Sequence, residues 1–106
     1  MTPTWFGPVD RPLFGWLHAP DGGTARAGVV LCPPTGYEAV CSHRTLRVVA
    51  ERLAELGIAA LRFDYDGTGD SAGRHDDPGR VDAWVGSVEA ATTLLRAAGA
   101  PVVAAV

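Results

Sequence analysis

The stretch from Gly57 to Gly73 reads GIAALRFDYDGTGDSAG, and it decides how the rest of the sequence is interpreted. Its first part, Ile58 to Phe63, is a short apolar run, which is typical of a strand buried on both faces of a sheet. Its second part is rich in aspartate and glycine, residue types that favour tight turns. The stretch therefore predicts a buried strand that ends in a polar, glycine-rich turn.

Four further strands are expected outside this stretch. Two short aromatic and aliphatic runs near the N-terminus are separated by glycine and proline, a pattern that favours two strands around a turn. A compact apolar run, AGVVLC, ends abruptly at Pro33 and Pro34, and a valine-rich segment closes the sequence. The four expected strands are Thr4–Phe6, Leu13–His18, Ala27–Cys32 and Val102–Val106.

Two amphipathic helices are expected between these strands. The first runs from Ser42, its expected N-cap, to Gly57, its expected stop, with apolar residues at three- and four-residue spacing. The second begins near Val81 and stops at Gly99. Asp77-Pro78 is expected to open this second helical region as an N-cap and a first-turn proline.

The order of these elements predicts an α/β fold in a single domain, 1–106. Strands that alternate with helices indicate a mostly parallel five-stranded sheet with right-handed crossover helices. Such strands need cover on both faces, yet only two helices are expected and the last strand runs into the C-terminus. We therefore expect an incomplete domain whose last strand self-associates or pairs with a complementing chain.

Composition excludes several functional classes. The chain has 106 residues, of which 47% are hydrophobic and 20% charged, and its net charge is -3, so it carries no basic surface for nucleic acid. No apolar run is long enough for a signal peptide or a membrane span, which favours a cytoplasmic protein without a membrane partner. Cys32 and Cys41 form no metal-binding or disulfide pattern, and no cofactor or metal is expected.

Four residues of the turn carry a resemblance to a known family. Asp64, Gly67, Gly69 and Ser71 fit the pattern D-x-x-G-x-G-x-S after a strand. With the upstream loop PPTGYE at 33–38 and the helix start at 42–44, the chain resembles the N-terminal half of an α/β-hydrolase, close to the serine-aminopeptidase-like and exosortase-associated hydrolases. The resemblance implies the spatial strand order one, two, four, three, five, with the second strand antiparallel.

The resemblance also implies a chemistry, the transfer of an acyl group from a small ester, thioester or amide to water. One oxyanion-hole amide would come from the loop after the third strand, where Pro33-Pro34 replaces the usual His-Gly. Since proline has no N–H, the donor candidates are Thr35, Gly36 and Tyr37, unless this loop only turns the chain. The nucleophile elbow and the rest of the triad would follow the fifth strand, so no catalytic residue is assigned within the chain.

Ser71 satisfies a second expression, G-x-S-x-G, over residues 69–73. A nucleophile elbow needs its serine directly between a strand and a helix, whereas the next helical pattern begins only near Val81. Ser71 is therefore interpreted as a turn residue. Surface or capping roles are expected for His18, His43 and His75, and core packing for Trp5, Phe6, Phe14, Trp16, Phe63 and Trp84.

Two alternatives to the serine hydrolase stay open. The sequence DYDGT at 64–68 resembles the nucleophile motif of haloacid-dehalogenase-type phosphatases, in which Asp64 would attack phosphorus and Asp66 act as acid and base over Mg²⁺. Against it, the chain has no lysine, which that family uses downstream. The other alternative is a non-catalytic remnant or interaction subunit that a partner chain completes.

Overall fold

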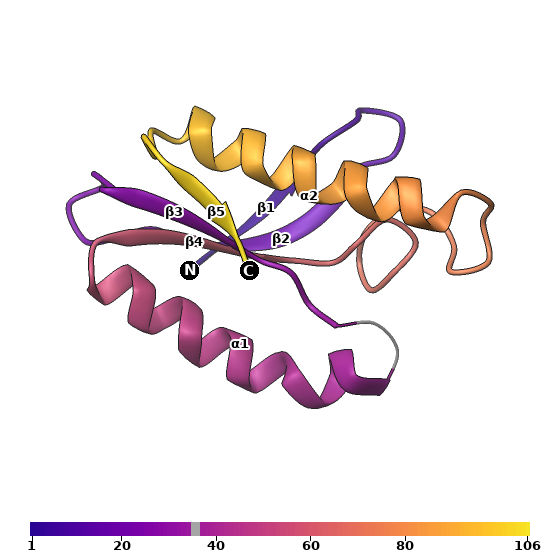
Figure 1. The fold of residues 1–106 in the computed structure, drawn as a ribbon, viewed down its shortest axis with the longest axis horizontal. Helices are drawn as coiled ribbons and strands as arrows, with labels where there is room; N and C mark the ends of the chain where they lie inside the picture. The colour runs from indigo at the N-terminus through magenta and orange to yellow at the C-terminus, as the bar shows by residue number, and fades with distance from the viewer. Residues whose placement is uncertain (35–36) are drawn as a thin grey trace.

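A computed structural model describes the backbone of residues 1–34 and 37–106, and the side chains of 1–34 and 42–106. The order of strands and helices is the one expected from the sequence (Figure 1). The elements are β1 (Thr2–Phe6), β2 (Leu13–His18), β3 (Ala27–Leu31), α1 (Tyr37–Glu55), β4 (Ile58–Phe63), α2 (Arg80–Ala97) and β5 (Val103–Ala105).

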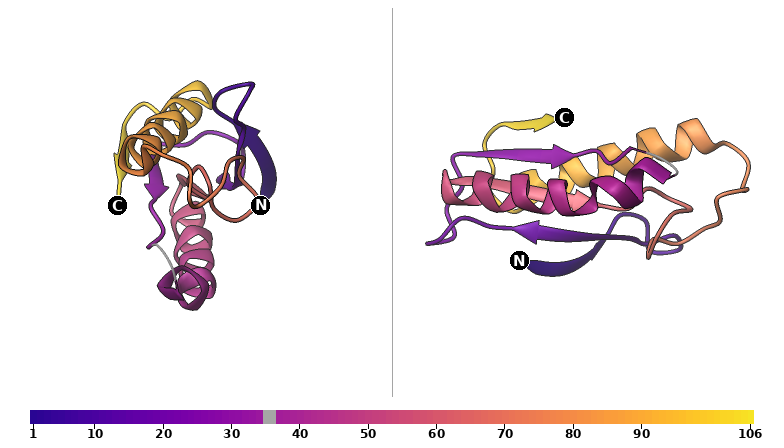
Figure 2. Two further views of the ribbon diagram at one scale, coloured as in Figure 1. Left: turned by 90° about the vertical axis from the view of Figure 1, so that its right-hand side faces the viewer. Right: turned by 90° about the horizontal axis from the view of Figure 1, so that it is seen from below.

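The strands form one mixed sheet in the order β1-β2-β4-β3-β5. β2 is antiparallel to both β1 and β4, whereas β3 is parallel to both β4 and β5. The views in Figure 2 place β1 and β5 at opposite edges of the sheet. The predicted strand order, the antiparallel second strand and the α/β class are thereby confirmed.

The two crossover helices lie on opposite faces of this sheet, α1 on one and α2 on the other (Figures 1 and 2). Successive side chains of a strand point to opposite faces, so β4 serves both layers. Its Ala59, Leu61 and Phe63 join the core beneath α2, together with Leu95. Its Ala60 joins a smaller core beneath α1, with Ala50 and Leu31. The long apolar run of β4 is explained by this double burial.

Helix α1 leaves part of its sheet face uncovered near β1 and β2. Phe6 and Phe63 are buried beneath α2 as expected, but Trp5 on β1 is 60% exposed. Trp5, Phe14 and Trp16 form an edge-to-face series, with ring centroids 5.0 Å and 5.6 Å apart. The expectation that all the aromatic residues fill the core is therefore wrong for Trp5, which lies at the exposed end of the series.

Both helix starts differ from the sequence-based expectation. α1 begins at Tyr37, so Ser42 lies inside the helix and is not its N-cap. α2 begins at Arg80 after Gly79, which has a φ of 70° and provides no side-chain cap. Asp77 instead accepts a hydrogen bond from the Arg74 N–H at 2.9 Å, closing the turn before the helix. A carboxylate engaged in that turn is not available to cap the later helix.

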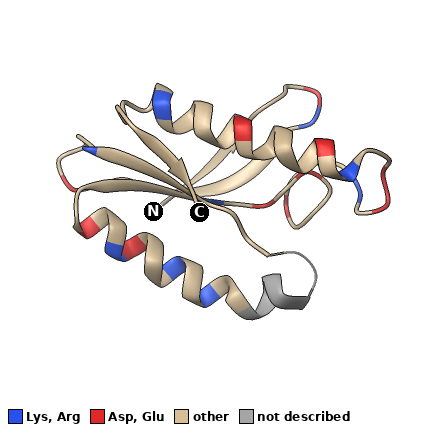
Figure 3. Ribbon diagram, in the orientation of Figure 1, with Lys and Arg blue, Asp and Glu red and all other residues tan. Residues whose placement is uncertain are grey.

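The exposed side of α1 carries ion pairs as well as two exposed valines, Val48 and Val49. Figure 3 shows basic and acidic residues along this helix, where Arg47 pairs with Glu51 and Arg52 with Glu55 at exposed positions. Exposed pairs of this kind add little stability, so they mainly keep this side of the helix in water. Among the residues that the structure describes, no helix combines the length and the apolar character needed to cross a membrane.

Candidate active-site cavity

A cavity of about 800 Å³ lies beside the ends of β3 and β4. Its walls include Phe14 and Trp16 of β2, residues 33–34 after β3, Leu46 of α1, and residues 64–65 and 67–70 of the loop after β4. The carboxyl ends of parallel strands are where open α/β sheets bind their ligands. The volume is in the range of small-molecule sites, about 300–1,000 Å³. The position and size make this cavity the candidate functional site.

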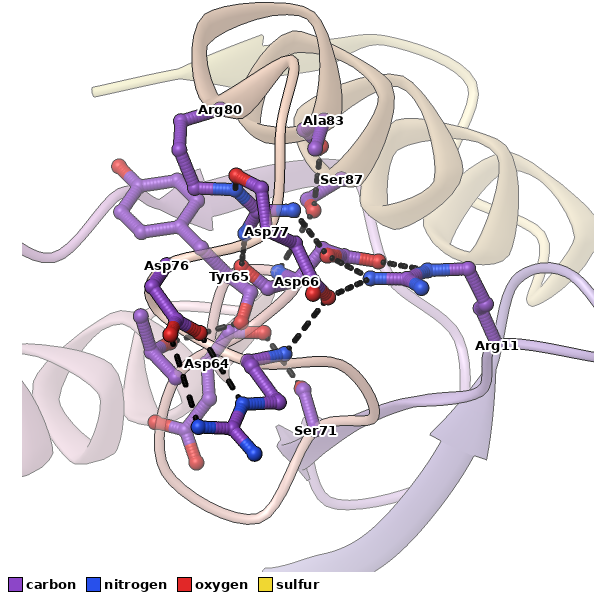
Figure 4. Close-up of polar contacts among 12 residues, drawn as sticks. Arg11, Asp64, Tyr65, Asp66, Ser71, Asp76, Asp77, Arg80, Ala83 and Ser87 are labelled. Carbon is purple, nitrogen blue, oxygen red and sulfur yellow. Dashed lines mark hydrogen bonds and ion pairs between the residues drawn. The ribbon is translucent and has the colours of Figure 1, made fainter.

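The loop beside the cavity contains the four residues of the D-x-x-G-x-G-x-S pattern, of which Asp64 and Ser71 are labelled in Figure 4. The Ser71 hydroxyl donates to the Asp64 carbonyl oxygen at 2.6 Å, and it accepts the Phe14 N–H at 2.9 Å. Gly67 and Gly69 have φ angles of 81° and 47°. A Cβ atom at Gly69 would collide with the Asp64 carboxylate, so a side chain is excluded there by space as well as by backbone conformation. The four residues thus hold one compact turn.

Ser71 has none of the surroundings of a nucleophile. Its side chain is 7% exposed, and its hydroxyl is engaged as both donor and acceptor by backbone groups. An activated serine needs a general base within hydrogen-bond reach, whereas the groups bonded to Ser71 are a carbonyl and an amide. The turn-residue interpretation of Ser71 is therefore consistent with the geometry.

On the other side of the sheet, Asp66 is the centre of an ion cluster (Figure 4). Arg11 donates two hydrogen bonds to its carboxylate, Nε at 2.9 Å and NH2 at 2.7 Å. Arg80 donates to the same carboxylate at 3.1 Å and to the Asp66 carbonyl at 2.9 Å. Asp77 accepts from Arg11 at 3.0 Å. The Arg11 hydrogen bonds hold the pKa of Asp66 below its usual value.

This geometry disfavours the magnesium phosphatase alternative. Asp64 lines the large cavity, whereas Asp66 lines a separate, smaller one beside Arg11 and Ser87. The carboxylate of Asp66 is committed to two arginines, which leaves it unavailable as a metal ligand or as an acid and base. Across the described residues, no three His, Cys, Asp or Glu side chains gather to hold a metal ion.

His18 and Arg62 form a buried pair that the sequence analysis missed. His18 is 4% exposed, and its Nε2 accepts a hydrogen bond from the Arg62 Nε at 3.0 Å. Burial, followed by the charge of Arg62, lowers the pKa of His18 from 6.5 to about 4. The expected surface role of His18 is therefore wrong. The available signal was a charged residue within an otherwise apolar strand, since arginine is rarely buried without a partner.

The other two histidines line the cavity. His43 lies on α1 and His75 in the loop that precedes α2, and both are exposed. Of the oxyanion-hole candidates, Thr35 and Gly36 lie outside the described residues, as does the side chain of Tyr37. The preceding Pro33 and Pro34, which have no N–H to donate, line the cavity.

The chain is similar to known proteins in structure, but it matches no known family in sequence. No family model matches the chain, and no curated protein matches it either. An α/β serine hydrolase without a lid from Xanthomonas campestris superposes with a TM-score of 0.73 and 24% identity, over 98% of this chain and 49% of that one. An α/β serine hydrolase homologue from Coxiella burnetii superposes with a TM-score of 0.63 and 23% identity, over 98% of this chain and 50% of that one. An esterase from Pyrococcus furiosus superposes with a TM-score of 0.70 and 19% identity, over 98% of this chain and 38% of that one.

These neighbours are all larger than the chain. Its 106 residues are covered almost completely, yet they span half or less of each of the three solved structures. At such identities the likeness establishes the fold. Together with the strand order β1-β2-β4-β3-β5, it shows that the chain has the α/β-hydrolase fold and forms a part of that larger fold.

Proposed function

We propose that the chain is the N-terminal part of a serine hydrolase that transfers an acyl group from a small ester, thioester or amide to water. The observation that carries the proposal is the cavity beside the ends of β3 and β4, within a sheet that has the α/β-hydrolase strand order. In this proposal the chain supplies the substrate cavity and one side of the oxyanion hole. A serine after β5 supplies the nucleophile, and the general base and its orienting acid lie beyond it.

The oxyanion hole is assigned to the loop after β3. Pro33 and Pro34 border the cavity but have no N–H, so the donor from this loop is the backbone amide of Thr35, Gly36 or Tyr37. A donor aimed at the developing oxyanion contributes about 100-fold to 1,000-fold in rate. This assignment rests on the resemblance and on the position of the two prolines.

The chain alone should be inactive, because its buried serines are engaged structurally. The Ser71 hydroxyl is held by backbone groups, and Ser87 donates to the Ala83 carbonyl while accepting the Asp66 N–H. His18, the buried histidine, is bonded to Arg62 rather than to a serine. A hydroxyl without an adjacent base is a weak nucleophile.

The test compares the 106-residue chain with a protein extended by the residues encoded after Val106. With a fluorophosphonate probe and a p-nitrophenyl ester, we expect no labelling and no turnover for the chain, and both for the extended protein. Labelling of the chain at Ser71, abolished in Ser71→Ala, would contradict the proposal. A stop codon directly after Val106 would also contradict it and favour a remnant.

An interaction subunit is the second candidate, and the exposed edge at β5 favours it. Among the described strands β5 pairs only with β3, and Val102 and Val106 beside it are 66% and 76% exposed. Unpaired edges of this kind add further strands from another chain. In this case the 106-residue chain self-associates or binds a complementing chain through β5.

Light scattering after size exclusion tests this second candidate. We expect the mass to rise with concentration, and Val106→Lys to suppress the rise. Val9→Lys, at a residue 99% exposed and remote from β5 in the sequence, is the matched control and should leave the rise unchanged. A monomer at high concentration, with a cooperative melt, would remove the argument for a complementing chain.

A further inference from the structure

Arg62 lies in the wall of the large cavity and is almost completely buried. It is on β4, opposite Trp16 of β2 in the antiparallel register, so the two side chains share one face of the sheet. Both line the cavity, yet Arg62 is only 7% exposed. A guanidinium keeps its positive charge in proteins, although burial lowers the pKa of Arg62. The cavity therefore has a buried positive charge in an otherwise largely apolar wall.

That charge makes no direct ion pair among the described residues, although the more distant carboxylates of Glu51 and Asp64 favour it and Arg47 opposes it. The Arg62 Nε donates to His18 Nε2 at 3.0 Å, and NH2 contacts the Met1 sulfur at 3.4 Å. His18, with its pKa near 4, is neutral at pH 7, and a thioether is a weak acceptor. In the described part of the chain no carboxylate comes within ion-pair distance of Arg62, whose NH1 makes no hydrogen bond there.

A buried charge without a direct ion pair is unfavourable, and an anion in the cavity would relieve it. Removing a charge from water is unfavourable unless a partner and hydrogen bonds replace the water. Arginine favours carboxylates in particular, because its planar fork matches their two oxygens. The open donor capacity of Arg62 thus points to a carboxylate ligand.

The rest of the lining narrows the ligand class. Asp64 and Asp70 lie in the loop wall of the same cavity, and Asp64 accepts the Asp70 N–H at 3.0 Å. Two negative side chains disfavour a ligand with several negative charges, such as a phosphate ester. Phe14 and Trp16 instead offer flat apolar surface beside Arg62. A single carboxylate on an apolar body suits both features.

We propose that this cavity binds a small apolar monocarboxylate, with its carboxylate on Arg62 and its body along Phe14 and Trp16. The site needs no nucleophile and no oxyanion hole, so it goes beyond the proposed acyl transfer and can be tested on the 106-residue chain. The absence of esterase activity would leave this inference intact, and the absence of carboxylate binding would leave the acyl-transfer proposal intact.

The test is isothermal titration calorimetry with 3-phenylpropionate at fixed pH and ionic strength. We expect a dissociation constant of about 0.1–5 mM, in the range for a ligand of this size. The uncharged 3-phenylpropionamide has the same shape and should bind at least about tenfold more weakly, because it loses the charge-assisted bonds to Arg62. This ligand comparison uses the unaltered protein and does not depend on whether a variant folds.

Two variants locate the site. Arg62→Met should weaken 3-phenylpropionate binding at least about tenfold, since it removes the charged donor while keeping a similar apolar volume. Arg52→Met, at an exposed arginine of α1 paired with Glu55, is the matched control and should bind as the unaltered chain does. Equal binding of the acid and the amide, no binding of the acid at 20 mM, or unchanged binding by Arg62→Met would each overturn the proposal.

Discussion

Two arginine sites on opposite faces of the sheet satisfy their charges in different ways. Beneath α2, Arg11 and Arg80 surround Asp66, and Asp77 supplies a second carboxylate. On the α1 face, Arg62 is more deeply buried than either, yet it has a neutral histidine and a thioether as neighbours. The first site holds its charges in direct ion pairs within the described chain, whereas the second makes no ion pair there.

The difference separates a structural role from a binding role. The Asp66 cluster joins the loop before β2, the turn after β4 and the start of α2, so its bonds hold these segments together. Arg62 contacts a neutral histidine at the end of β2 and the thioether of Met1, and it lines a cavity. A charge that is buried without a partner adds no stability by itself, which favours a role in recognition over a role in the fold.

The largest effect is expected from breaking the matched site. Asp66→Asn removes the charge that Arg11 and Arg80 share, leaving two cations close together, and should lower the free energy of unfolding by about 2–4 kcal/mol. Urea denaturation followed by circular dichroism measures it. Asp70→Asn, at an exposed aspartate of the same loop, is the control, with an expected change within about 0.5 kcal/mol. Equal small losses in both variants would show that the cluster is dispensable.

The second-largest effect is expected from acid, which should lower the free energy of unfolding through His18, the neighbour of Arg62. The pKa of His18 is about 4 in the folded chain against 6.5 for the free side chain, so between these pH values the unfolded chain binds a proton that the folded chain does not. The stabilisation that depends on neutral His18 is fully present above pH 6.5. It is lost as pH falls towards 4, and the loss is about 2 kcal/mol after allowance for partial solvation.

The control for this pH effect is His18→Gln, which keeps an acceptor for Arg62 but cannot titrate. Unfolding free energies of both proteins are measured from pH 7 to pH 4, and the contribution that Asp66 loses near pH 4 is the same in both proteins and cancels in their difference. As the pH is lowered, the free energy of unfolding of the unaltered chain should fall relative to that of His18→Gln. Parallel curves would mean that His18 is solvated and that Arg62 is less buried than described.

The order of the elements and of the strands was predictable because its signals are local. A buried strand such as Ile58–Phe63 shows as an apolar run, and the turn after it shows in the spacing of Gly67 and Gly69. The family resemblance then placed the strands in the order that the structure has. Helix starts were less predictable, since Asp77 can cap either a helix or a turn, and its bond to Arg74 decides for the turn.

The charged sites were not predictable, because their partners lie far apart in the sequence. Arg62 and His18 are separated by 44 residues, and Arg11 and Asp66 by 55. Only strand pairing brings these side chains together, so the sequence does not reveal the partners, although the charge of Arg62 within an apolar strand indicates that it has one. The cavity could be expected from the fold, but its unmatched arginine could not.

A smaller effect is expected from the turn that separates the two sites. Ser71→Ala deletes the bond to the Asp64 carbonyl and leaves the Phe14 N–H without its acceptor, which should cost about 1.5 kcal/mol. Thermal and urea unfolding measure it. Thr93→Ala, at an exposed hydroxyl of α2 that only returns to the Glu89 carbonyl, is the control. An unchanged stability in Ser71→Ala would mean that water replaces both bonds.

The smallest effect, and the sharpest contrast with the matched site, is expected from Arg62→Met. Methionine fills a similar apolar volume, so the substitution relieves the cost of an unmatched buried charge while it removes the bond to His18. These two terms oppose each other, and the free energy of unfolding should change by no more than about 1 kcal/mol. Urea denaturation of this variant beside Asp66→Asn makes the comparison directly. A loss as large as that of Asp66→Asn would show that Arg62 holds the fold together as Asp66 does. A small change, accompanied by loss of 3-phenylpropionate binding, would mean that this arginine is retained for its ligand.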